Sequence, residues 1–207
     1  MHLIYLSRFS FEQRTRAGFR FNFPIMKFKF DIEKANASIK LILVNFENGI
    51  ADFHKIFKIL YFAEQKHLST FGRLIFYDHY IAMKNGPVPS SVYDIFKTLK
   101  ADSIFTLNSK IDFKNEYKII DDFYIQLLNK DINTDIFSET ELECLSQSIE
   151  ENKLLDFNTL ASKSHDSAWE NTSPNDEISV FQIAKAAGAN DEMLKYINLN
   201  FENDLVF

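Results

Sequence analysis

The stretch from 51 to 70 constrains the fold more than any other part of the chain. Apolar side chains recur in it at spacings of three and four residues, and additional apolar residues widen the stripe until most sides are apolar. One face carries, in order, Phe53, Phe57, Leu60, Ala63 and His67. A helix that is apolar on most sides is stable only when other elements surround it. The sequence therefore predicts a central core helix over about 51–70.

Helical periodicity recurs on both sides of this segment. Each further predicted helix has apolar residues at spacings of three and four, or a serine placed to cap its first turn. The expected helices cover about 31–48, the segment after Ser90 or Ser91, the segment after the capping box Ser138–Glu141, about 156–163, and one or two short pieces within 178–194.

Residues 111–128 interrupt the helical pattern. Two runs there are typical of strands, Tyr117-Lys-Ile-Ile and Phe123-Tyr-Ile-Gln-Leu-Leu, and the pair Asp121-Asp122 between them is typical of a turn. The sequence therefore predicts a mainly α fold: a single helical domain at about 31–172 with one small β-hairpin near 117–128.

The first 25 residues differ from the rest of the chain. Residues 1–29 contain six Lys and Arg against one acid, Glu12, and 1–25 show no sustained helical period. Met26 then opens a stretch that is typical of the start of a small bacterial domain. We expect 1–25 to be a dispensable extension or a mis-assigned start, 26–175 to be the main domain, and 176–207 to be a C-terminal helical extension.

The charge of the remaining chain bears on its partners. The whole chain has 23 Lys and Arg against 29 Asp and Glu, so beyond residue 29 the balance is 17 against 28, or −11. Such a body repels phosphate backbones and attracts basic partners, so we do not expect nucleic acid as a partner. No apolar run reaches the roughly 18 residues that indicate a membrane span, and Arg8 and Glu12 interrupt any signal peptide. We therefore expect no membrane contact and a cytoplasmic location.

Catalytic and metal signals are weak. Cys144 is the single cysteine, which excludes an internal disulfide. His54, His67 and His79 lack the spacing of metal ligands. His165-Asp-Ser167 are neighbours in sequence, whereas a catalytic triad joins separate chain segments. We therefore predict that the chain is not an enzyme and has no catalytic, cofactor-binding or metal residues and no cofactor.

Two other segments suggest a docking role. Gly86-Pro-Val-Pro-Ser-Ser91 contains two prolines of fixed φ, which make a stiff wedge, and the single Trp lies four residues after a His, on one helical face. The residues alone leave a structural corner and a docking edge both open. We hypothesise that the wedge packs near 165–169 and forms or supports a partner-binding face. Its candidate residues are Tyr80, Gly86, Pro87, Val88, Pro89, Tyr93, His165 and Trp169.

Five motifs occur in order along about 35–172. They are Lys58-Ile-Leu-Tyr-Phe-Ala-Glu64, His67-Leu-x-x-Phe-Gly-Arg73, Tyr80-Ile-Ala-Met-Lys-Asn-Gly-Pro-Val-Pro-Ser-x-x-Tyr93, Ser138-Glu-x-Glu-Leu142 and Ser164-His-Asp-x-Ala-Trp-Glu170. Together they resemble the Panacea domain, the SocA-like antitoxin family. One departure is Leu74-Ile-Phe-Tyr-Asp78, where the family more often has a proline and a tighter polar turn.

The resemblance implies an antitoxin, often prophage-associated, that neutralises a cognate protein toxin by direct contact, with the toxin encoded adjacently. It also implies that some members hand the toxin to a Clp-type protease as proteolytic adaptors, and it supplies no catalytic residues. Two other interpretations stay open. One is a DNA-binding autorepressor-like module, for which a basic stripe including Lys97 and Lys100 would argue. The other is a hydrolase that uses His165 or His67, for which a deep polar pocket would argue.

Overall fold

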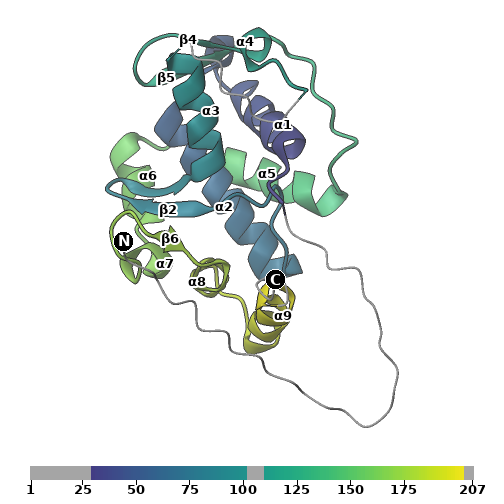
Figure 1. The fold of residues 1–207 in the computed structure, drawn as a ribbon, viewed down its shortest axis with the longest axis vertical. Coiled ribbons are helices and arrows are strands. Elements are labelled where there is room, and N and C mark those ends of the chain that lie inside the picture. The colour runs from purple at the N-terminus through teal and green to yellow at the C-terminus, as the bar shows by residue number, and fades with distance from the viewer. Residues whose placement is uncertain (1–28, 102–109, 203–207) are drawn as a thin grey trace, which may run out of the picture.

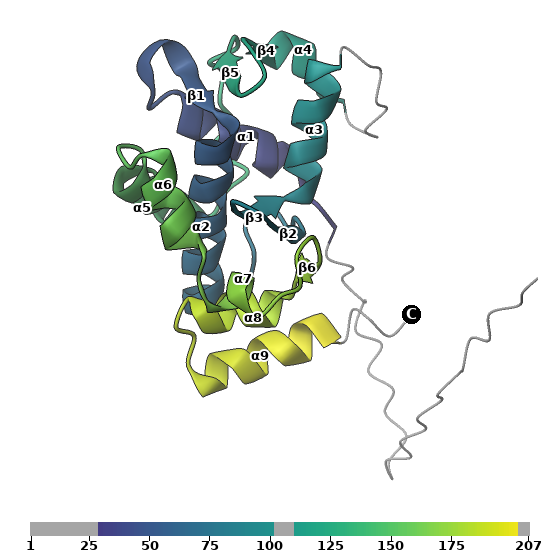
Figure 2. The same cartoon turned by 90° about the vertical axis from the view of Figure 1, so that its left-hand side faces the viewer.

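The helix α2 (Phe53–Phe71) lies at the centre of the molecule, with other elements on several sides of it (Figures 1 and 2). It begins at Asp52, whose carboxylate accepts a hydrogen bond from the backbone N–H of Lys55 at 2.8 Å. It ends at Gly72, which adopts the left-handed conformation with φ of 70°. Every residue from 56 to 64 is buried, as the apolar pattern predicts for a surrounded helix.

The computed structural model describes residues 29–101 and 110–202. The expectations about residues 1–25 fall outside the described residues.

Helices α1 (Ile32–Leu43), α5 (Glu139–Asn152), α6 (Phe157–Ser164) and α8 (Val180–Ala186) contact α2 directly. In Figure 2, α5 and α6 lie on one side of α2, and α3 lies on the other. The predicted capping box is confirmed, because Ser138 and Glu141 each bond to the backbone of the other. The remaining helical elements are η1 (Glu47–Gly49), α3 (Ser90–Lys100), α4 (Phe113–Glu116), α7 (Ser167–Glu170) and α9 (Asp191–Glu202).

The predicted serine cap of α3 is wrong. Pro89 occupies the N-cap position and provides no side-chain hydrogen bond. The carboxylate of Asp78 takes this role from a distant part of the chain, accepting from the backbone N–H groups of Ser91 at 2.9 Å and Val92 at 3.1 Å. Two N–H groups that have no acceptor within the helix are satisfied in this way, and α3 is held against the segment that precedes strand β2.

The β-structure is more extensive than one hairpin. The predicted hairpin is confirmed as β4 (Tyr117–Ile119) and β5 (Tyr124–Leu127), but in the described residues it is part of an antiparallel sheet of order β1-β5-β4. A second antiparallel sheet has the order β3-β2-β6. The added strands are β1 (Ile50–Asp52), β2 (Tyr80–Met83), β3 (Gly86–Pro89) and β6 (Glu177–Ile178).

The Gly-Pro-Val-Pro segment is therefore a strand, although its prolines indicated a break. Strand β3 pairs with β2 in antiparallel register, with Ala82 opposite Pro87 and Tyr80 opposite Pro89. Because β3 lies at the edge of its sheet, the missing N–H groups of its prolines do not interrupt a second ladder. The wedge predicted from the sequence is the outer strand of a β2–β3 hairpin.

Two buried apolar clusters share α2. The first joins the first half of α2 to α1, α3, α5 and the β1-β5-β4 sheet, and the second joins the later part of α2 to β2 and to α6 through α9. Residues of the C-terminal part contribute to the second cluster, where Ile183 and Ile197 are each 1% exposed. Helices α8 and α9 lie together at one end of α2 (Figure 1).

Candidate functional site

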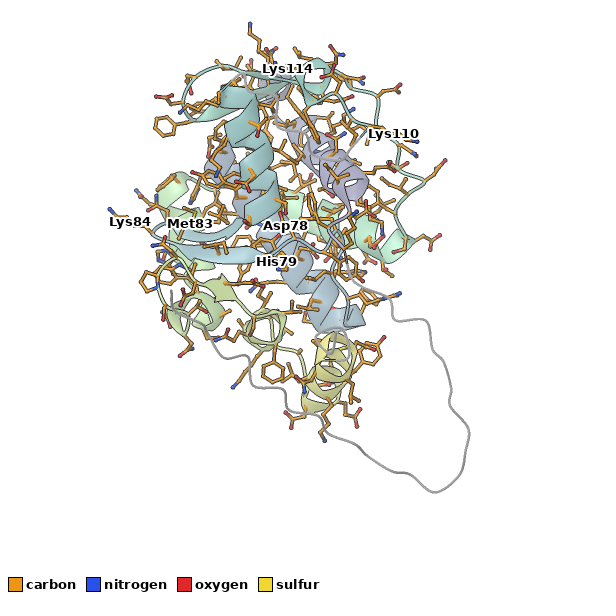
Figure 3. All side chains as sticks on the ribbon, in the orientation of Figure 1. Asp78, His79, Met83, Lys84, Lys110 and Lys114 are labelled. Atoms are coloured by element: carbon orange, nitrogen blue, oxygen red, sulfur yellow. The ribbon has the colours of Figure 1, made fainter. Side chains whose placement is uncertain are left out.

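The β2–β3 hairpin is packed tightly against α6. Gly86 has φ of 96°, and a Cβ added there would overlap the Oγ of Ser164 and lie 3.0 Å from the Nζ of Lys58. Both the conformation and the close approach require glycine at this position. The turn of the hairpin, at Met83 and Lys84, extends to the edge of the molecule (Figure 3).

Lys58 lies beneath this hairpin and is fully buried. Its ammonium group donates a 2.7 Å hydrogen bond to the carbonyl oxygen of Pro87. Burial lowers the pKa of this amine to about 7, and within the described residues no carboxylate forms an ion pair with it. Lys58 therefore joins the central helix to the edge strand through a single hydrogen bond.

The 165–169 segment contacts the same hairpin. The indole Nε1 of Trp169 donates to the carbonyl oxygen of Met83 at 2.8 Å. The ring of His165 stacks on the indole with centroids 3.7 Å apart and planes 8° from parallel. The structure thus places the 165–169 segment against the β2–β3 hairpin, of which the wedge is the outer strand, and places Gly86 of the wedge beside Ser164.

Of the eight binding residues proposed from the sequence, four are buried and four are half-buried. Tyr80 is 1% exposed and its ring contacts that of Tyr61, with centroids 5.2 Å apart, inside the second apolar cluster. Gly86, Pro87 and Pro89 are also buried, so these four residues support the surface from beneath. The half-buried residues, which present atoms to solvent, are Val88, Tyr93, His165 and Trp169.

Asp166 serves as a structural connector. Its carboxylate accepts from the backbone N–H groups of Ala168 and Trp169, at 2.9 and 3.1 Å, and so caps α7. It also accepts from the side chains of Tyr61 at 2.9 Å and Gln65 at 2.7 Å, both on α2. The His-Asp-Ser order in the sequence therefore reflects a helix cap whose acid is bonded to the central helix.

Two further histidines, His67 and His79, are also held in structural contacts. His67 is buried, and its Nδ1 donates to the carbonyl oxygen of Arg73 at 2.7 Å, with burial lowering the pKa of the ring. The exposed His79 lies at the start of β2 (Figure 3), with Nδ1 2.9 Å from a carboxylate oxygen of Glu177. Among residues 29–101 and 110–202, no group of three or more His, Cys, Asp or Glu is arranged to hold a metal ion.

A groove opens beside the hairpin, between it, α3 and the β4–β5 turn, and we call it the hairpin groove. Its volume is about 540 Å³, and its lining is mainly apolar. Five elements or turns contribute: α2, the β2–β3 hairpin, α3, the β4–β5 turn and α6. The main apolar contributors are Phe53, Phe57, Val88, Tyr93, Phe123 and Phe157.

His54 connects two walls of the hairpin groove. Its ring stacks on Phe157 with centroids 4.0 Å apart, and its Nε2 lies 3.3 Å from the carbonyl oxygen of Asn85 in the hairpin turn. Burial, together with the charge of Lys58, lowers the pKa of this ring to about 4, so His54 is neutral at pH 7. Because a carbonyl can only accept, Nε2 carries the proton.

Lysines surround the rim of the hairpin groove. Lys97 pairs with Asp94 at 2.7 Å, and its ammonium group lies 4.8 Å from the centre of the Tyr93 ring. Lys100 pairs with Asp122 across the groove at 2.6 Å. Lys84, at the hairpin turn, is exposed and has no ion-pair partner within the part of the chain that the structure describes.

Tyr93 of the hairpin groove was a candidate from the sequence, whereas Phe123 and Phe157 were not predicted as binding residues, although a signal for each was present. Phe123 directly follows the turn Asp121-Asp122, where a large apolar side chain is unusual, and it is 69% exposed. Phe157 is the first residue of α6 and is 48% exposed. Large exposed apolar residues that lie together indicate an interaction surface.

Comparison with known protein families places most of the described core in one family. A family model described as antitoxin SocA-like, Panacea domain, matches residues 56–170, which is more than half of the chain. The matched region contains most of α2, the β2–β3 hairpin and the 165–169 segment, and the family is the one that the ordered motifs resemble. Neither the curated proteins nor the solved structures gave a match. Over the described ranges, no helix has the length and apolar character needed to cross a membrane.

Proposed function

Because the chain belongs to the SocA-like antitoxin family with a Panacea domain, we propose that it binds a partner toxin and neutralises it by direct protein contact. The family match is the observation that carries this proposal. The half-buried aromatic residues beside a rigid hairpin support it, because aromatic residues are the ones that most often dominate binding energy at protein interfaces.

The proposed binding face has a supporting layer and a contacting layer. Tyr80, Gly86, Pro87 and Pro89 lie beneath it and hold the hairpin in one conformation. A surface that is ordered before binding loses little conformational entropy when a partner docks. In this proposal Val88, Tyr93, His165 and Trp169 form the contacting layer, and the chain neutralises its toxin without catalysis, metal or cofactor.

The fate of the bound toxin defines two variants of the proposal. In the first, binding alone blocks the toxin, and in the second the chain also delivers the toxin to a Clp-type protease. The half-life of the toxin in cells that contain or lack the protease separates them. A DNA-binding role receives little support, because Lys97 and Lys100 of α3 are each paired with an aspartate.

The test is co-expression with the open reading frame adjacent to the gene. If that product stops growth when expressed alone, we expect this chain to restore growth and to co-purify with the product. Single changes Tyr93→Ala, His165→Ala and Trp169→Ala should each weaken the complex by about tenfold or more. Helical content should be retained in all three, and the melting temperature should be retained in Tyr93→Ala and His165→Ala, whereas Trp169→Ala also loses its hydrogen bond to Met83 and should melt somewhat lower. Failure of the unsubstituted chain to restore growth would overturn the proposal. If every substitution that abolishes binding also unfolds the chain, the interface lies elsewhere.

A further inference from the structure

We propose that the hairpin groove holds an acidic linear segment of the partner, which inserts an aromatic or large aliphatic side chain between α3 and α6. This inference rests on the proposed function and adds to it the chemistry of the segment that is recognised.

The apolar part of the hairpin groove requires an apolar occupant. Phe123 and Phe157, which come from different parts of the chain, lie on the same groove and expose 69% and 48% of their surface. Contact between this apolar surface and water is unfavourable, and an inserted apolar side chain lowers the free energy by removing the surface from solvent. The volume of the hairpin groove, about 540 Å³, is within the usual range of ligand pockets. A bulky side chain therefore fits in it.

The rim selects the charge of the occupant. Three exposed lysines, Lys84, Lys97 and Lys100, lie on the rim of the hairpin groove against two aspartates, Asp94 and Asp122, although the chain as a whole carries a net charge of −6. An ammonium group has three N–H donors, so Lys97 and Lys100 can bond to a carboxylate of the partner while they keep their own aspartates. Lys84 has no ion-pair partner in the described part of the chain and can pair with a further carboxylate.

The same charges argue against other occupants. The basic segment 1–29 of this chain, with six Lys and Arg against one acid, has the wrong sign for a lysine rim. A nucleic acid needs a row of cations to replace its counterions, whereas two of the rim lysines are already paired with acids. An acidic peptide needs only a few contacts of this kind.

The direct test measures binding of fluorescent peptides to the full chain by anisotropy. The probes are acetyl-Glu-Asp-Leu-Phe-Glu-Asp-amide, its charge-reversed counterpart acetyl-Lys-Arg-Leu-Phe-Lys-Arg-amide, and a single-stranded thymidine oligonucleotide. We expect the acidic peptide to bind best and its affinity to fall as salt is raised. Stronger binding of the basic peptide or of the oligonucleotide, or no binding of the acidic peptide, overturns the inference.

Matched variants locate the site. Lys84→Glu should weaken the acidic peptide by about tenfold, whereas Lys110→Glu, at an exposed lysine on the opposite edge of the view in Figure 3, should not. Phe157→Ser should weaken it as well, and Phe181→Ser, which changes a similarly exposed phenylalanine on α8, should not. Equal effects of target and control variants place binding elsewhere and overturn the inference.

The two proposals can fail separately. Growth restored by the unsubstituted chain, together with failure of the peptide experiments, refutes only the acidic-segment inference. Failure to restore growth refutes the antitoxin proposal, whereas the peptide affinities still decide which chemistry the hairpin groove selects.

Discussion

The side chain of Lys58 donates a 2.7 Å hydrogen bond to the carbonyl oxygen of Pro87, so that a buried amine of the central helix holds the edge strand of a hairpin. A proline-containing edge strand has fewer N–H groups with which to pair. The amine supplies a donor to a carbonyl on this strand. The position of the hairpin, and with it the proposed binding face, therefore depends on the core.

Stability should depend on pH through Lys58. Its pKa is about 7 in the folded chain and 10.5 when unperturbed, with burial as the cause. Between these values the unfolded chain holds a proton that the folded chain has released, so the free energy of unfolding rises with pH. In urea titrations, the free energy of unfolding of the unsubstituted chain minus that of Lys58→Met should increase from pH 7 to pH 10. Lys110→Met, at an exposed lysine, is the control. The free energy of unfolding of the unsubstituted chain minus that of Lys110→Met should stay constant over the same pH range.

Glu64 should produce the opposite slope at lower pH. Burial raises its pKa from 4.5 to about 8, although the carboxylate accepts from the backbone N–H groups of Ile75 and Phe76. Between pH 4.5 and 8 the folded chain holds a proton that the unfolded chain has released, so the free energy of unfolding falls as pH rises. In urea titrations, the free energy of unfolding of the unsubstituted chain minus that of Glu64→Gln should therefore decrease as the pH is raised from 4.5 to 8. A constant difference would show that Glu64 stays ionised in the fold.

Gly86→Ala should destabilise the chain by more than about 1 kcal/mol, because it combines a positive φ with overlap on Ser164. Gly188→Ala is a matched control, since Gly188 has φ of 83° and no atom within 4 Å of an added Cβ. The excess loss at position 86, measured by urea denaturation, reports the packing of the hairpin on α6. A second change, Ser164→Gly, should recover part of that excess. Equal losses at the two glycines would contradict this packing.

Trp169→Phe should cost about 1 kcal/mol, the net value of one hydrogen bond, because it removes the donor to Met83 but keeps a ring beside His165. The measurement is urea denaturation followed by far-ultraviolet circular dichroism, since the chain has no other tryptophan. Trp169→Ala removes the stacking as well and should cost more. A neutral Trp169→Phe would mean that the bond to Met83 contributes nothing to stability.

Much of the helical structure follows from the sequence alone. The central helix could be predicted because its apolar residues repeat every three or four positions, and the capping box at Ser138 and Glu141 joins residues three apart. The hairpin at 117–128 has its turn residues between its two strands. In each case the interacting groups are close in sequence, so local spacing determines the structure.

The remaining strands and the hairpin groove depended on tertiary contacts. Strand β1 has three residues and β6 has two, and they pair with partners distant in the chain, such as Ile50 with Gln126 and Tyr80 with Ile178. The cap of α3 comes from Asp78, and the groove combines five elements or turns. Such short strands have no detectable alternation, and their hydrogen bonds form only after the core has brought distant segments together. The sequence determined which residues would be helical and apolar, and the packing around α2 decided which of them meet at one surface.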